Sequence, residues 1–65
     1  MKAVYDVKTD TLVLELRAGP VAESNEDKPG IILDYDADGN IVSIEILDAS
    51  KRVEEACSMQ FEVAA

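Results

Sequence analysis

The chain has 65 residues with 14 acidic and 6 basic side chains and no histidine, which gives a net charge of −8. This charge repels phosphate backbones and anionic lipid headgroups, so nucleic acids and membrane surfaces are not expected as partners, whereas basic proteins are. The lack of histidine excludes imidazole-based catalytic triads, and the single cysteine excludes an internal disulfide and argues against a zinc site.

The length predicts one small domain over residues 1–65. A chain of this size buries only about 60% of its unfolded surface, so a metal, a partner chain or an efficient core has to add stability. No apolar run approaches the ~18 residues of a membrane-spanning helix. We therefore expect a cytoplasmic protein in which Cys57 is reduced.

Residues 1–17 alternate between apolar and polar side chains and predict a β-hairpin. With residues 7–10 as the loop, Tyr5 faces Leu12 and Lys2 faces Glu15, so that one register explains both faces of the hairpin. Residues 18–30 are polar and punctuated by glycine and proline. They predict either a short edge strand over residues 21–24 or a functional loop.

Residues 31–47 predict a second hairpin with Asp38 and Gly39 in the turn. That turn places three apolar pairs on one face: Tyr35 with Val42, Leu33 with Ile44, and Ile31 with Ile46. The following residues 48–61 predict a helix, capped by Asp48 or Ser50. Its apolar stripe is formed by Val53, Ala56, Cys57 and Phe61, and Cys57 is expected to be a small core residue.

The second hairpin also has the spacing of a calcium-binding loop. The candidate ligands are Asp34, Asp36, Asp38, the carbonyl of Asn40, and Glu45. The flanking residues do not have the helical pattern that such a loop needs, so the hairpin interpretation is favoured and the acids provide charge and solubility. No metal, cofactor or catalytic residue is expected, with calcium binding through this hairpin kept as the alternative.

With these residues laid out, the chain resembles a family of small prokaryotic proteins known as domain of unknown function 2283. The resemblance is carried by Tyr5-Asp6, Asp10, and the strand from Leu12 to Leu16. It continues through residues 21–24 and 29–36 and is strongest over residues 38–42 and 44–51. It implies a compact antiparallel sheet with a C-terminal helix. It also implies that such proteins can act as the small antitoxin-like partner of a neighbouring protein.

The sequence therefore predicts an α+β fold, in which an antiparallel β-meander of four to five strands carries one C-terminal helix packed on one face. The helix can cover only one side of the sheet. Apolar side chains are also expected on the other side, namely Val4, Val13, Ile32 and Ile41. We interpret that side as a partner surface. The predicted function is a non-enzymatic protein-interaction module that forms a homodimer and binds a basic protein.

Overall fold

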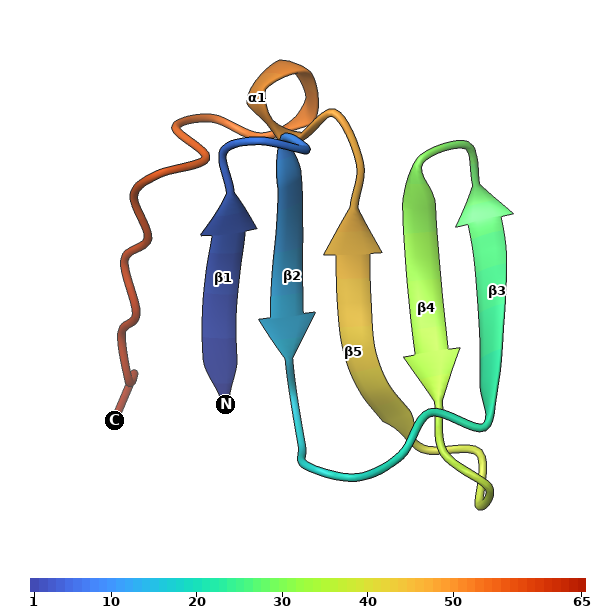
Figure 1. Cartoon of the computed structure of the whole chain (residues 1–65). Coiled ribbons are helices and arrows are strands. Elements are labelled where there is room, and N and C mark those ends of the chain that lie inside the picture. The colour runs from blue at the N-terminus through green and yellow to red at the C-terminus, as the bar shows by residue number, and fades with distance from the viewer.

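Five strands form one antiparallel sheet in the computed structural model, which describes residues 1–65 (Figure 1). The α+β class is confirmed. The strands lie in the order β1-β2-β5-β4-β3, and a single short helix follows β5. The elements are β1 (Lys2–Asp6), β2 (Thr11–Glu15), β3 (Glu23–Lys28), β4 (Ile31–Tyr35), β5 (Ile41–Ile46) and α1 (Ala49–Arg52).

The predicted meander order is wrong, because β5 lies between β2 and β4. Residues 16–22 carry the chain from β2 to the far edge of the sheet, and seven extended residues span up to about 23 Å. Three strand spacings need only about 14 Å, so the crossing is easy. The apolar β5 thereby becomes the central strand. The edge strand predicted near residues 21–24 lies at Glu23–Lys28, where all six residues are exposed and their charges suit an edge.

The β1–β2 hairpin has the predicted register, with Lys2 opposite Glu15 and Tyr5 opposite Leu12. In the second hairpin the pairs of Leu33 with Ile44 and of Ile31 with Ile46 are confirmed. The pair of Tyr35 with Val42 is wrong.

The second hairpin turns through a loop that is one residue longer than predicted. Gly39 has a φ of 84° and donates its N–H to the carbonyl of Asp36 at 3.1 Å, as in a three-residue hairpin loop. A bulge takes up the extra residue, so Tyr35 pairs with Ile41. Val42 lies in the bulge, and its carbonyl accepts hydrogen bonds from the N–H groups of residues 16 and 17 at 2.8 and 3.3 Å. Ile41 therefore lies on the same side of the sheet as Tyr35, and not on the opposite side, as predicted.

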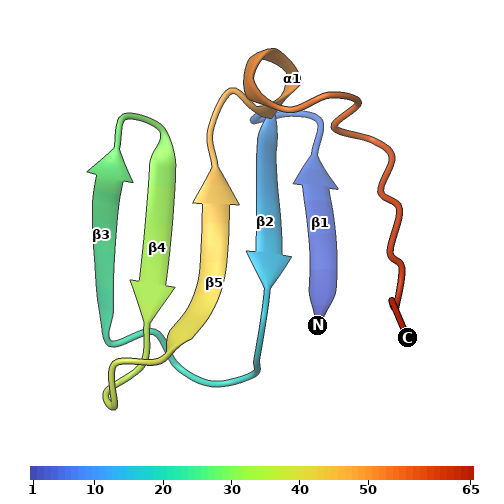
Figure 2. The same cartoon turned by 180° about the vertical axis from the view of Figure 1, so that it is seen from behind.

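The predicted helix over residues 48–61 is also wrong, since α1 ends at Arg52 and Val53 is extended, with φ −117° and ψ 150°. A short helix is marginal unless it can bury its apolar stripe against a core, and α1 lies beyond the end of the sheet rather than across a face (Figures 1 and 2). Residues 53–65, here called the C-terminal segment, have no regular structure. Cys57 is exposed rather than a core residue.

The register divides the side chains of the sheet into two faces. The apolar face consists of Ala3, Tyr5, Leu12, Leu14, Ile31, Leu33, Ile44 and Ile46. The polar face consists of Lys2, Val4, Val13, Glu15, Ser24, Glu26, Ile32, Asp34, Ser43 and Glu45. Only two apolar residues of the whole chain are buried, Val42 and Ala49. The sheet therefore lacks a second layer that would turn its apolar face into a core.

Candidate functional site

Three neighbouring strands place a row of polar side chains in the middle of the polar face. Ser24 of β3, Asp34 of β4 and Ser43 of β5 are direct cross-strand neighbours. The Ser24 hydroxyl donates to Asp34 Oδ1 at 2.5 Å, and the Ser43 hydroxyl donates to Asp34 Oδ2 at 2.6 Å. Asp34 is only 3% exposed, so the two hydroxyls take the place of water around its carboxylate.

Glu45 lies diagonal to Asp34, across from Ile32, and its carboxyl group hydrogen-bonds to the Asp34 carboxylate. Burial raises the pKa of Asp34, but the hydrogen bonds from Glu45, Ser24 and Ser43 outweigh it and hold the pKa below its usual value. The same hydrogen bond, together with burial and repulsion from Asp34, raises the pKa of Glu45. The pKa values of Asp34 and Glu45, here called the carboxyl pair, are thus shifted in opposite directions, as expected for two neighbouring carboxyl groups that interact with each other.

The Glu45→Gln variant is expected to be more stable than the native protein at pH 7, by about 1 kcal/mol, because an amide can donate a hydrogen bond to Asp34 at any pH and carries no charge that repels it. The raised pKa of Glu45 means that its stabilising contribution is complete below the usual value of 4.5 and is lost as the pH rises through the folded-state pKa. The advantage of the variant should therefore grow between pH 4 and pH 7 in urea denaturation. Equal stabilities of the two proteins across that range would contradict the interaction between the carboxyl groups of Asp34 and Glu45.

The five candidate calcium ligands do not surround one point. Asp34 and Glu45 belong to the carboxyl pair on the polar face. The Asp36 carboxylate instead accepts the backbone N–H groups of Asp38 and Asn40 at 3.0 and 2.9 Å and so organises the hairpin loop. Nowhere in residues 1–65 do three acidic or thiol side chains gather in a way that could hold a metal ion. The candidate ligands are thus divided between the polar face of the sheet and the hairpin loop.

A second polar cluster, which the sequence reasoning missed, joins the first hairpin to α1. Asp10 accepts hydrogen bonds from the Tyr5 hydroxyl at 2.7 Å, from the backbone N–H of Ser50 at 3.0 Å, and from the Ser50 hydroxyl at 2.7 Å. It therefore caps α1 from 40 residues away, whereas Asp48 makes no side-chain cap hydrogen bond. Its hydrogen bond is the main reason that the pKa of Tyr5 is raised to about 12. No local pattern in the sequence indicates a cap from so distant a residue.

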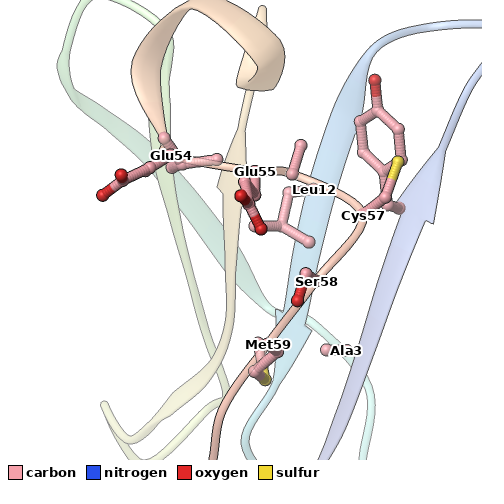
Figure 3. Close-up of a pocket in the computed structure, with 10 residues that line it drawn as sticks. Ala3, Leu12, Glu54, Glu55, Cys57, Ser58 and Met59 are labelled. Carbon is pink, nitrogen blue, oxygen red and sulfur yellow. The ribbon is translucent and has the colours of Figure 1, made fainter.

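The C-terminal segment runs along the β1 side of the sheet (Figure 1), and a cavity of about 260 Å³ lies between it and the β1–β2 half of the apolar face (Figure 3). The sheet contributes Ala3, Tyr5 and Leu12 to the lining, and the segment contributes residues 53–59. The carboxyl pair does not line this cavity. The carboxyl pair and this cavity thus lie on different sides of the sheet.

Comparison with known proteins gives a family and one relative. A family model described as protein of unknown function (DUF2283) matches residues 2–50, which extend from β1 to the start of α1. An uncharacterized protein of Methanocaldococcus jannaschii is 37% identical over 51 residues, which are 78% of this chain and 43% of that protein. The chain spans less than half the length of this relative. No solved structure matches the chain. No helix of the structure has the length and apolarity needed to cross a membrane.

Proposed function

The chain belongs to the DUF2283 family of proteins of unknown function, and from its own surfaces we propose that it is a non-catalytic protein-interaction module. The module associates with a second copy of itself and offers its acidic surface to a basic protein. The two activities use different sides of the sheet. The apolar face serves self-association, and the polar face serves the basic partner.

The observation that carries the proposal is the small number of buried apolar residues. Hydrophobic residues make up 48% of the chain, yet only Val42 and Ala49 are buried. A domain of this size is marginally stable even with a complete core. Burial of the remaining apolar side chains against another chain supplies the missing stabilisation at about 25 cal/mol per Å².

The basic partner is inferred from the charge. The polar face carries Glu15, Glu26 and the carboxyl pair, with Lys2 opposite Glu15, within a chain of net charge −8. Such a surface attracts a cationic protein and accelerates the encounter with it. An antitoxin-like module that masks a basic protein encoded by a neighbouring gene fits this description.

Self-association is tested by the mass of the protein in solution. Sedimentation equilibrium between 5 µM and 500 µM should give twice the chain mass of 7.1 kDa over the upper part of that range. Unfolding should be concentration-dependent as well, because the folded dimer is favoured by mass action. A folded protein of 7.1 kDa at every concentration would refute the self-association.

The basic partner is tested by co-expression with the products of adjacent genes. The expected result is co-purification of a basic protein, with an affinity that falls as the salt concentration rises. The Glu15→Gln, Glu26→Gln double variant should weaken this complex without changing the dimer mass. A complex that is insensitive to both salt and these substitutions would argue against an electrostatic interface on the polar face.

A further inference from the structure

We propose that a second copy of the chain packs face to face on the apolar face, so that the two sheets form a sandwich with the central strands β5 at the symmetry axis. This inference rests on the self-association through the apolar face proposed above and gives it one arrangement of the two sheets. It also gives the C-terminal segment a role, since the segment of each protomer covers the part of the partner's sheet that the partner's own segment leaves open.

Two cross-strand rows make the apolar face continuous. One row consists of successive cross-strand neighbours, namely Tyr5, Leu12, Ile46 and Ile31. The next row consists of Ala3, Leu14, Ile44 and Leu33. None of these eight side chains is buried. A sheet with one apolar face is stable only when another layer covers it, and two such sheets pack about 10 Å apart with their side chains interdigitated.

The exposed area has the size that a dimer needs. A monomer of 7.1 kDa is expected to expose about 4,100 Å², whereas this chain exposes 5024 Å². The excess of about 900 Å² is close to the ~800 Å² that each partner buries in a standard interface. Burial of one apolar face by a second copy therefore accounts for the excess without any further partner.

The C-terminal segment determines how the two copies are oriented. It borders the β1–β2 half of the apolar face, where Met59 and Phe61 line a second hollow with Ala3 and Leu14. Met59 remains 59% exposed and Phe61 70% exposed. The C-terminal segment borders the β1–β2 half of the apolar face and leaves the β4 half open. When the two-fold axis runs parallel to the strands, the segment of each copy meets the open β4 half of the other sheet. A two-fold axis perpendicular to the strands would instead place the C-terminal segments of the two copies against each other.

The sheet edges are poorer contacts for a second copy. The edge strand β3 exposes all six of its residues, including Glu23, Glu26 and Asp27, so two β3 edges would repel each other. The other edge, β1, has the C-terminal segment beside it (Figure 1). A symmetric contact through the apolar face avoids both problems.

The first test compares one substitution on each face. The Ile44→Lys variant should raise the dimer dissociation constant by at least about 30-fold, whereas Val4→Lys on the polar face, where Val4 is 42% exposed, should leave it unchanged. Because Ile44→Lys could unfold the chain, Phe61→Ser provides a second variant outside every strand, with an expected weakening of about 10-fold. A wild-type monomer would refute the self-association itself. A dimer that is unaffected by Ile44→Lys and Phe61→Ser would overturn only the assigned interface.

The second test locates the symmetry axis in the Cys57→Ser background. A nitroxide on Lys8→Cys, in the exposed β1–β2 loop, is mixed with an isotope-labelled chain that carries no nitroxide. With the axis parallel to the strands, the strongest broadening of amide signals in the labelled chain falls on residues 28–31, at the β3–β4 turn. Strongest broadening at residues 14–17 would indicate the perpendicular axis, and the absence of broadening would exclude this dimer. Either of these results would overturn the proposed arrangement.

Discussion

Replacement of Asp34 by alanine is expected to destabilise the protein by about 3 kcal/mol, a large part of the stability of a domain of this size. Asp34 is 3% exposed and accepts hydrogen bonds from the hydroxyl groups of Ser24 and Ser43. Without the carboxylate these donors lose their shared acceptor. The buried hydroxyl of Ser43 is affected most, because no solvent replaces the lost partner. Urea denaturation at pH 7 measures the loss.

Two matched variants show whether the loss comes from the buried hydrogen bonds. Asp38→Ala removes a carboxylate from the exposed hairpin loop and should change the stability by no more than about 0.5 kcal/mol. Asp34→Asn keeps the size and one acceptor oxygen and should cost less than Asp34→Ala. If Asp34→Ala lost no more stability than Asp38→Ala, the carboxyl pair would have no structural importance.

The Asp10→Ala variant is expected to lower the melting temperature by about 5 °C or more, because it removes the cap of α1 and places alanine at a φ of 53°. The loss of the Tyr5 hydrogen bond provides a separate readout. The pKa of Tyr5, which is raised to about 12, should return toward its usual value of 10.0. Ultraviolet absorbance of the tyrosinate form measures this shift directly.

The pH dependence follows from the direction of the Tyr5 shift. A raised pKa means that the contribution of Tyr5 to stability is complete below pH 10 and is lost as the pH rises toward 12. The Asp10→Asn variant serves as the control, since asparagine tolerates a positive φ and keeps one oxygen acceptor. It should melt above the Asp10→Ala variant. An unchanged titration of Tyr5 in Asp10→Ala would contradict the assigned hydrogen bond.

Local patterns predicted the pairing of adjacent strands but not their order in the sheet. The β1–β2 register follows from the alternation of side chains around a four-residue loop, and the structure has it. The β4–β5 register was predicted as far as Leu33 and Ile44. The bulge at Val42 was not predicted, because its hydrogen bonds come from residues 16 and 17, which follow β2 and donate their N–H groups to the Val42 carbonyl. A contact between elements that are distant in the chain leaves no local signal.

For the helix and the candidate site as well, local sequence patterns did not reveal the contacts between distant elements. The stripe of Val53, Ala56, Cys57 and Phe61 has helical spacing, but spacing stabilises a helix only where a core receives it. The acids of residues 34–45 were identified as candidate ligands, yet Asp36 lies beyond the end of β4, and its carboxylate binds backbone N–H groups of the hairpin loop instead of joining the carboxyl pair. The neighbours that determine the chemistry of Asp34 come from β3 and β5. The positions of these strands depend on the order of the whole sheet.

The central position of β5 has a consequence for the way the chain folds during synthesis. The hairpins β1–β2 and β3–β4 each form from contiguous residues, but within the sheet they are joined to one another through β5. Until residues 41–46 have left the ribosome, the nascent chain consists of two separate hairpins, and an isolated hairpin is at best marginally stable. The sheet therefore closes in one late step, when the last strand inserts between two waiting edges and most of the long-range contacts form together.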